Sequence, residues 1–261
     1  MIHNHIYCGE CAVVMRDEIP DDSIDLTVTS PPYDNLRTYN GFVFPFEEIA
    51  RQLYRITKPG GVVVWVVGDA TIKGSETGTS FRQALYFKEI GFNLHDTMIY
   101  LKKSVTFPEI NRYYPSFEYM FVMSKSKPKT VHLLADKPNT QAGKKVTGTE
   151  RQADGQLTKG VGSRLKRTVK DFSVRYNAWV VETGNNKSSV DRVSYKHSGS
   201  FPERLAEDHI LSWSNPGDVV LDPMCGSGTT LKMAKKNDRQ YIGIDIAQEY
   251  VDMAWRRVEN G

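Results

Sequence analysis

Short apolar runs alternate along this chain with stretches in which apolar residues recur at helical spacing. Residues 62–67 form a continuous run of Val and Trp, which is typical of a strand covered on both faces. Just before it, Ile49, Leu53 and Ile56 lie on one face of a predicted helix, which Pro59 and two glycines bring to an end. Because buried strands alternate with helices, the pattern predicts an α/β domain with a mostly parallel sheet.

The same patterns recur along most of the chain. The predicted strands lie at residues 2–7, 24–28, 62–67, 96–102, 118–124, 219–222 and 241–245. The predicted helices lie at residues 12–19, 47–57, 80–90, 205–212, 231–236 and 247–258. Residues 172–181 form one further candidate strand.

Residues 125–196 differ from the rest of the chain in both pattern and charge. They show little periodicity and carry 16 Lys/Arg against 6 Asp/Glu, whereas the remainder carries 18 Lys/Arg against 25 Asp/Glu. A basic segment inside an acidic chain predicts an inserted surface for a polyanion, although a solvated Lys-rich loop would have the same composition. We therefore expect one domain, formed by residues 1–124 and 197–261, with an insertion at 125–196.

Composition excludes several classes of protein. No apolar run approaches the roughly 20 residues of a membrane helix, and the first residues do not have the pattern of a signal peptide. Three cysteines make no disulfide framework, so we expect a cytoplasmic protein. Cys8 and Cys11, with His3 and His5 upstream, have no second pair of ligands to complete a metal site, and we predict none.

The first candidate for chemistry is the turn Ser30-Pro31-Pro32-Tyr33, which follows the predicted strand at 24–28. The two prolines cannot donate hydrogen bonds to a sheet, so the strand must end there. The turn then presents a hydroxyl, carbonyl oxygens and an aromatic ring at the carboxyl end of a strand, where ligands bind in open α/β sheets. A Pro-Pro corner with a nearby Tyr is also common in ordinary loops, so the motif needs support from elsewhere in the chain.

The second candidate joins a strand, a glycine turn, a helix and an acidic strand end. Asp222 ends one strand, Gly226 and Gly228 allow a tight turn close to a ligand, and Asp245 ends the next strand 17 residues after Gly228. The helix start offers amides to a carboxylate or phosphate, and Asp245 can hold both hydroxyls of a ribose. A phosphate-binding loop needs a Lys after its second glycine, and a dinucleotide fingerprint needs a third glycine where this chain has Leu231. The pattern therefore favours a nucleoside without a pyrophosphate, such as S-adenosylmethionine, over a merely tight strand–helix turn.

With both motifs present, the chain resembles the β group of amino-group DNA methyltransferases. That family carries a Ser/Asp/Asn-Pro-Pro-Tyr/Phe motif, a target-recognition region and an Asp-Pro-x-x-Gly-x-Gly-Thr/Ser motif, in this order. Here the motifs are residues 30–33 and 222–229, and the resemblance covers nearly all of 1–130 and 197–258. It implies a doubly wound, mostly parallel, seven-stranded Rossmann-like sheet, S-adenosylmethionine as the cofactor and double-stranded DNA as the substrate. A homodimer and a cognate restriction endonuclease are further candidate partners, and no membrane is expected.

The resemblance also assigns residues to a catalytic part at 1–124 and a cofactor-binding part at 197–261. The catalytic residues that it implies are Ser30, Pro31, Pro32 and Tyr33. The cofactor-binding residues that it implies are Glu10, Cys11, Phe201, Pro202, Asp222, Pro223, Gly226, Ser227, Gly228, Thr229 and Asp245. In the inserted target-recognition region, the candidates for DNA contacts are Arg164, Lys166, Arg167 and Arg175. Two positions depart from the family pattern, because Glu10 stands where Asp is usual and Ser198 stands where Pro is usual.

The chemistry of the Pro-Pro turn follows from the nature of an exocyclic amine. Its lone pair is delocalised into the base, so the amine is a poor nucleophile. The Ser30 hydroxyl and the Pro31 carbonyl can accept hydrogen bonds from its two N–H groups and so favour a pyramidal nitrogen. This nitrogen attacks the sulfonium methyl without a covalent enzyme intermediate. A base in a duplex must flip out to reach such a pocket, and Tyr33 would stack on it.

The identity of the amino group stays open at this point. Ser30 resembles cytosine-N4 enzymes more than adenine-N6 enzymes, where Asp is usual, so we predict cytosine-N4 transfer with adenine-N6 as the alternative. A C5-cytosine enzyme needs a nucleophilic Cys after a proline, and Cys8, Cys11 and Cys225 follow Tyr, Glu and Met. Action on RNA and a catalytically silent DNA-binding protein with this fold stay open as well. A small-molecule or protein-glutamine methyltransferase is also compatible with the motifs, but the basic insertion disfavours it.

Overall fold

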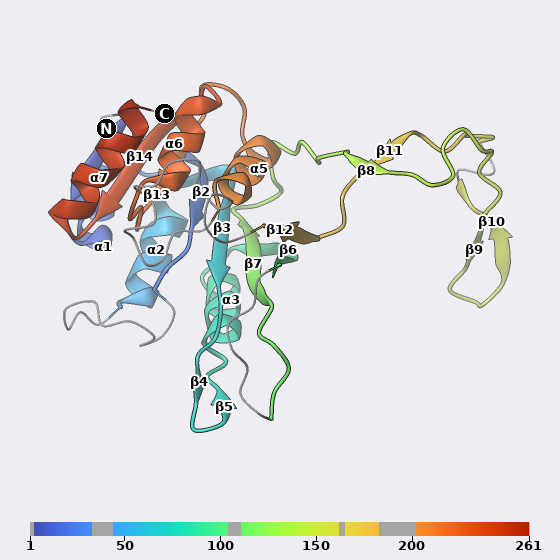
Figure 1. Cartoon of the computed structure of the whole chain (residues 1–261), viewed down its shortest axis with the longest axis horizontal. Coiled ribbons are helices and arrows are strands. Elements are labelled where there is room, and N and C mark those ends of the chain that lie inside the picture. Colours follow the sequence, from blue (N-terminus) through green and yellow to red (C-terminus); the bar gives the residue numbers. More distant parts are fainter. Residues whose placement is uncertain (1–2, 33–43, 104–110, 162–164, 183–201, 261) are drawn as a thin grey trace. The chain divides into compact units, whose positions relative to one another are not determined.

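The computed structural model describes residues 3–32, 44–103, 111–161, 165–182 and 202–260. It divides the chain into two compact units. The body comprises residues 1–132 and 177–261, and the ribbon unit comprises residues 133–176. The body holds a large sheet with helices around it (Figure 1). None of the described helices is long and apolar enough to cross a membrane.

The sheet of the body has eight strands. In order across the sheet they are β1 (His5–Cys8), β14 (Gln240–Asp245), β13 (Val219–Asp222), β2 (Ile24–Thr29), β3 (Thr57–Val67), β7 (Phe117–Ser124), β6 (Asn93–Lys102) and β12 (Ala178–Val181). Five of the seven pairings are parallel, and β7 runs antiparallel to both of its neighbours. The mostly parallel sheet that the sequence predicts is therefore confirmed, with one strand more than the seven expected.

The additional strand is β12, which pairs in parallel with β6 at the edge of the sheet. Trp179 and Val181 are buried, whereas Ala178 and Val180 are exposed. This strand lies within the longer candidate strand at 172–181, but only its last four residues join the sheet. The strand is short and buries only one face, so it gives a weaker sequence signal than the continuous run in β3.

Helices cover both faces of the sheet, which makes the fold doubly wound as predicted (Figure 1). One layer contains α1 (Cys11–Glu18), α2 (Phe46–Ile56) and α3 (Thr79–Glu89). The other layer contains α5 (Glu203–Trp213), α6 (Thr229–Lys236) and α7 (Gln248–Glu259). The apolar stripe of α2, formed by Ile49, Leu53 and Ile56, is fully buried and belongs to the same core as Trp65 of β3.

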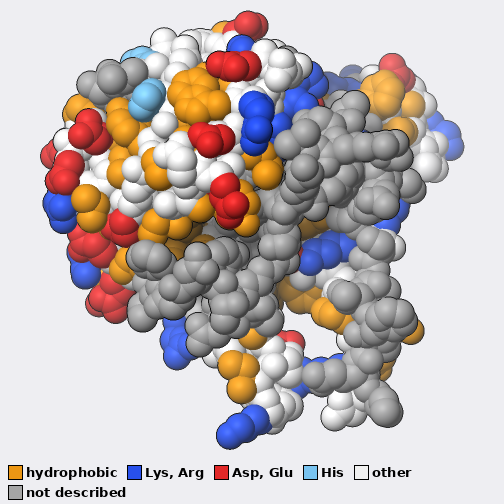
Figure 2. All heavy atoms as spheres, turned by 60° about the vertical axis from the view of Figure 1, so that its left-hand side comes forward, with side chains coloured by type: hydrophobic (Ala, Val, Ile, Leu, Met, Phe, Trp, Pro, Cys, Tyr) orange, Lys and Arg blue, Asp and Glu red, His pale blue; other side chains and the backbone are white. Residues whose placement is uncertain are grey.

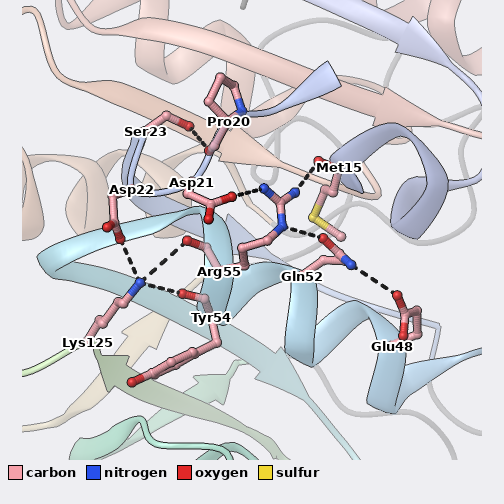
Figure 3. Close-up of polar contacts among 10 residues, drawn as sticks. All are labelled: Met15, Pro20, Asp21, Asp22, Ser23, Glu48, Gln52, Tyr54, Arg55 and Lys125. Atoms are coloured by element: carbon pink, nitrogen blue, oxygen red, sulfur yellow. Dashed lines mark hydrogen bonds and ion pairs between the residues drawn. The ribbon is translucent and has the colours of Figure 1, made fainter. Parts of the chain in front are cut away.

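A polar network ties the turn before β2 to α2 and to the residue that follows β7 (Figure 3). Arg55 of α2 forms an ion pair with Asp21. Lys125 donates to Asp22 at 2.7 Å and to the carbonyl oxygen of Tyr54 at 2.9 Å. In the sequence, Lys125 is the first cation of the predicted basic insertion. In the structure, its ammonium group instead links the turn before β2 to the end of α2 within the body.

The ribbon unit consists of short antiparallel strand pairs. β8 (Lys137–Pro138) pairs with β11 (Phe172–Ser173), and β9 (Thr149–Arg151) pairs with β10 (Leu157–Lys159). None of the residues described between 133 and 176 is buried. The unit carries ten Lys/Arg and four Asp/Glu, whereas the body carries 24 Lys/Arg and 27 Asp/Glu. Acidic side chains gather along the left side of the body in Figure 2.

Both ends of the ribbon unit join residues that are fixed to the body. The N–H of His132 donates to the carbonyl oxygen of Ser212 in α5 at 2.8 Å. At the other end, the carbonyl oxygen of Asn177 accepts from the N–H of Ile99 in β6 at 2.8 Å, just before β12 begins. The ribbon unit, at residues 133–176, falls inside the insertion predicted at 125–196 and is shorter than that insertion at both ends.

Candidate active site

The predicted motifs lie at one edge of the sheet. The strands β1, β14, β13 and β2 run in parallel, so their carboxyl ends face the same way. Cys8 pairs with Asp245 in register, and the N–H of Gly9 donates to the Asp245 carbonyl oxygen at 2.9 Å. The N–H of Cys225 donates to the carbonyl oxygen of Ile244 at 2.9 Å. The turn after β1 and the turn after β13 are thereby both held against the end of β14.

The Pro-Pro turn begins where β2 ends, at Thr29. Thr29 and Pro31 are buried, and Ser30 and Pro32 are partly buried. The Thr29 hydroxyl donates to Oδ1 of Asp222 at 2.8 Å. Tyr33 lies outside the described residues, so its stacking role stays a prediction.

Asp222 ends β13 and connects the two motifs. Its Oδ1 accepts from the Thr29 hydroxyl and from the N–H of Met224, the latter at 3.2 Å. The hydroxyl of Thr230, at the start of α6, donates to the carbonyl oxygen of Val28 in β2 at 3.2 Å. Burial raises the pKa of the Asp222 carboxyl to about 6, although the hydrogen bond from Thr29 opposes the shift. The sequence assigns Asp222 to the cofactor, and the structure directs its carboxylate towards the Pro-Pro turn.

The glycine turn is held by Asp245. Gly226 and Gly228 have φ values of 49° and 78°, in the left-handed region that favours glycine. One carboxylate oxygen of Asp245 accepts from the N–H of Gly226 at 2.9 Å, and the other accepts from the N–H of Ala247 at 3.0 Å. Burial raises the pKa of Asp245, and these backbone hydrogen bonds oppose the shift. Each oxygen has a second lone pair, so the carboxylate can still accept hydrogen bonds from a ligand.

Helix α6 starts directly after this turn. Gly228 precedes its first residue, and no side chain among the described residues caps its N-terminus. The remaining residues of the motif, Pro223, Ser227 and Thr229, are all buried. The turn therefore combines amides at a helix start with a carboxylate at the neighbouring strand end, which are donors and acceptors suited to an amino-acid carboxylate and a ribose.

The turn after β1 places Glu10 and Cys11 at the same sheet edge. The Glu10 carboxylate caps α1, accepting from the N–H of Ala12 at 3.1 Å and of Val13 at 2.9 Å. Burial, with a smaller contribution from Glu10, raises the pKa of the Cys11 thiol to about 12, so it is neutral at physiological pH. Glu10 thus has a structural task at the helix start, where sequence reasoning foresees only a contact with the cofactor.

The last predicted cofactor segment precedes α5. Pro202 is buried and directly precedes Glu203, the first residue of this helix. Helix α5 packs against α6, which begins at the glycine turn. Phe201 lies outside the described residues, so its contact with the cofactor stays a prediction.

A model of the DNA methylase family, covering the N6 and N4 enzymes, matches residues 24–256 of this chain. The chain belongs to the N6/N4 DNA methylase family. The resemblance carried by the two motifs is therefore confirmed, and S-adenosylmethionine is the methyl donor of this methyltransferase, as predicted.

Two relatives extend the match over most of the methyltransferase. The chain is 60% identical over 248 residues to the orphan methyltransferase M.BamHII of Bacillus amyloliquefaciens, covering 94% of this chain and 92% of that protein. It is 28% identical over 263 residues to the type II methyltransferase M.BglII of Bacillus subtilis, covering 97% of this chain and 68% of that protein.

Solved structures share the fold of the methyltransferase. The PvuII DNA methyltransferase, titled cytosine-N4-specific, superposes with a TM-score of 0.69 at 20% identity, covering 98% of this chain and 86% of that chain. M1.HpyAVI in its complex with SAM superposes with a TM-score of 0.62 at 22% identity, covering 97% and 98%. At these identities the similarity establishes the Rossmann-like fold.

Sequence reasoning missed one buried residue that contacts the glycine turn, Arg257 of α7. Its side chain is almost fully buried and contacts both Ser227 in the glycine turn and Glu203 at the start of α5. A signal for it was present, because Arg257 follows the buried Ala254 by three residues and therefore lies on the apolar face of its helix.

The candidates for DNA contacts belong to the ribbon unit. Lys166 and Arg167 are exposed. Arg175 instead forms two hydrogen bonds with the carboxylate of Asp136, at 2.6 and 2.5 Å, which leaves less of its guanidinium for DNA. Arg164 lies outside the described residues.

No group of three or more potential metal ligands is found among the residues that the structure describes. Cys8 is exposed, and its sulfur contacts the carbonyl oxygen of Ile246 at 3.8 Å. Cys11 is partly buried beside Glu10.

Proposed function

We propose that this methyltransferase transfers the methyl group of S-adenosylmethionine to the exocyclic N4 of cytosine at a specific site in DNA. The observation that carries the proposal is Ser30, a neutral hydroxyl acceptor at the first position of the Pro-Pro turn. The family resemblance associates Ser at this position with cytosine enzymes and Asp with adenine enzymes. A charged Asp would be a stronger acceptor, so this difference acts directly on the amino group.

The Pro-Pro turn supplies the acceptors for the amino group. The Ser30 hydroxyl and the Pro31 carbonyl accept hydrogen bonds from its two N–H groups, so the lone pair becomes localised on a pyramidal nitrogen. This nitrogen attacks the methyl carbon in line, and a C–N bond forms as the C–S bond breaks, with its electron pair left on the now neutral sulfur. The methylated nitrogen then releases one proton to solvent. The hydrogen bond from Thr29 to Asp222 supports this role, because it fixes the residue before Ser30 within a buried network.

The methyl donor supplies an electrophilic methyl group on a positively charged sulfur. The residues that we propose hold it are those of the glycine turn, with the start of α6 towards its carboxylate and Asp245 towards its ribose. Asp245 already accepts from Gly226 and Ala247, so its orientation is set before a ligand arrives. Gly9, Glu10 and Cys11 complete the proposed pocket from the side of β1.

We propose that the ribbon unit reads the DNA. In the β9–β10 pair, Lys159 lies opposite Thr149 and Leu157 lies opposite Arg151, so these four side chains share one face. Glu150 lies opposite Thr158 on the other face. One face is therefore cationic and the other is not, and a two-stranded ribbon has the width that the major groove of DNA admits.

The test of this function is the chemical identity of the product. The full chain is incubated with several unmethylated DNAs and labelled S-adenosylmethionine, and the DNA is then digested to nucleosides and separated. We expect labelled N4-methylcytosine, formed far more slowly by the Ser30→Ala variant. Labelled N6-methyladenine instead would overturn the cytosine assignment while keeping the family, and no label in any DNA would overturn the proposal as a whole.

Adenine-N6 transfer is the second candidate, because the family includes both activities. The same digestion separates the two products. A homodimer and a cognate restriction endonuclease also stay predictions. The orphan designation belongs to M.BamHII, and it favours a methyltransferase that acts without an endonuclease partner.

A further inference from the structure

Arg257 is a buried arginine that belongs to neither sequence motif. Its Nη1 donates to the Ser227 carbonyl oxygen at 2.7 Å, to the Ser227 hydroxyl at 2.9 Å and to the Thr229 hydroxyl at 3.1 Å. Its Nη2 donates to Oε1 of Glu203 at 3.0 Å. A single guanidinium from the last helix thus holds the glycine turn with one nitrogen and the start of α5 with the other.

Glu203 is the shared acceptor of this arrangement. The same oxygen, Oε1, also accepts a hydrogen bond from the ammonium group of Lys232 in α6 at 3.1 Å. The side chains of Arg257, Glu203 and Lys232 are only 2%, 12% and 12% exposed. Three charged groups removed from water cost free energy, and such clusters are often no more stabilising than apolar residues of the same volume. Stability alone is therefore a weak explanation for the cluster.

The geometry of a guanidinium explains it better. Its N–H groups point in fixed directions within one plane, so it can set the angle between two groups that it binds. Lysine has one compact ammonium group and cannot reproduce this arrangement. Here the two groups are the Ser227–Thr229 turn and Glu203, which directly follows Pro202.

We propose that Arg257 is a positioning residue for the methyl donor. It fixes the Ser227–Thr229 turn relative to the start of α5, so that both segments meet the amino-acid end of S-adenosylmethionine in the same pocket. The inference rests on the proposed function, in which the glycine turn holds the cofactor, and on the prediction that Pro202, just before α5, contacts it. Arg257 itself touches neither reactant and acts through the turn.

The experiment is calorimetric titration of S-adenosylmethionine into the full chain, combined with steady-state kinetics. The key variant is Arg257→Lys, which retains a positive charge opposite Glu203 but loses the planar fork. The matched control is Arg256→Ala, the exposed neighbour on the same helix. A second variant, Arg257→Met, removes the charge and leaves Glu203 paired with Lys232.

We expect Arg257→Lys to raise the Kd for S-adenosylmethionine about tenfold, and Arg257→Met to raise it further. The KM for the cofactor should rise in parallel, while the KM for DNA, the kcat at saturation and the thermal midpoint without cofactor stay near those of the wild type. Arg256→Ala should match the wild type in all of these quantities.

Two results would overturn the inference while leaving the proposed function intact. One is a cofactor Kd for Arg257→Lys within about twofold of the wild type, which corresponds to a negligible change in binding free energy. The other is a parallel rise of both KM values with a lowered thermal midpoint, which would mark a purely structural residue. Failure of the wild-type chain to bind S-adenosylmethionine would instead overturn the proposed function together with the inference.

Discussion

In the body, side chains from distant parts of the sequence hold one another, whereas in the ribbon unit almost every side chain faces outwards. Thr29 and Asp222 are 193 residues apart and share a buried hydrogen bond. By contrast, none of the described residues of the ribbon unit is buried, and Leu157, Leu165 and Phe172 are each more than half exposed. An isolated two-stranded ribbon is only marginally stable in water, and the described part of the ribbon unit has no buried residues to stabilise its short strand pairs.

The comparison also separates two uses of the same residue type. Arg257 in the body is buried and binds only acceptors of its own chain among the contacts described. Arg151 in the ribbon unit is exposed on the cationic face of β9–β10. Counting basic residues along the sequence treats the two alike, whereas burial separates an arginine enclosed in the body from one exposed to solvent.

The largest expected effect comes from Ser30→Ala, which tests whether chemistry and DNA binding reside in different units. Loss of one acceptor from a preorganised site should lower the rate of methyl transfer about 100-fold or more. Affinities for S-adenosylmethionine and DNA should stay close to those of the wild type, as measured by calorimetry and fluorescence anisotropy. A loss of DNA affinity comparable with the loss of rate would contradict the separation.

The next effect concerns pH and the body alone. The folded-state pKa of Asp222 is about 6, above the value of about 3.9 for an unfolded Asp, so the folded state holds this proton more tightly. The stability that protonation contributes is present below about pH 4 and is lost as the pH rises through about 6. Asp222→Asn keeps the accepting oxygen for Thr29 and Met224 but cannot ionise.

The free energy of unfolding of Asp222→Asn relative to the wild type should therefore rise by on the order of 2–3 kcal/mol between pH 4 and pH 7. Urea unfolding at several pH values measures it. A constant difference between the two proteins across this range would show that Asp222 does not titrate there. Asp252→Asn, at an exposed position of α7, is the control.

A pair of glycines tests the difference in packing between the two units. Gly228 and Gly155 have similar φ values, 78° and 85°. A Cβ at Gly228 would lie 2.8 Å from the Cβ of Ala254 in α7, whereas a Cβ at Gly155 would meet nothing within 4 Å. Gly228→Ala should lower the free energy of unfolding by roughly 2 kcal/mol, and Gly155→Ala by clearly less. Equal losses in urea unfolding would contradict the picture of a tight body and an open ribbon.

The smallest expected effect comes from the cationic face of the ribbon unit. The double variant Arg151→Ala/Lys159→Ala should weaken DNA binding about tenfold at low salt and reduce the slope of log K against log[salt] by about two. Cofactor affinity should not change. Arg16→Ala/Lys88→Ala removes two exposed cations from the body and serves as the control. An equal effect of both double variants on DNA binding would show that the cationic face of β9–β10 contributes no more to DNA binding than other exposed cations.

The fold could be read from the sequence wherever the hydrophobic pattern was strong. The apolar run in β3 and the stripe of Ile49, Leu53 and Ile56 in α2 both fall where predicted, because burial on two faces leaves a clear mark. The strand β12 is only the last part of the candidate strand predicted at 172–181. Its boundaries were hard to predict, because four residues at a sheet edge bury only Trp179 and Val181.

The candidate site could be predicted less completely than the fold. The spacing of the motifs indicates which residues lie close together, but not which contacts each side chain makes. Asp222 and Asp245 come to the same edge of the sheet, as the pattern around the glycine turn predicts. The network that directs Asp222 to Thr29 depends on the pairing of β13 with β2, strands that are far apart in the sequence. Arg257 was missed for a related reason, since no motif contains it and its partners lie in the glycine turn and α5.

The anchoring of the ribbon unit at His132 and Asn177 has a consequence for how this protein can diversify. Both anchors are main-chain hydrogen bonds to elements of the body, so they do not depend on the sequence between them. Residues inside the loop can be lengthened, shortened or exchanged for those of a relative without shifting the register of any strand in the sheet. Under the proposed role of the ribbon unit, exchange of residues 133–176 at these two junctions would change the DNA specificity and leave the proposed methyl-transfer site in place.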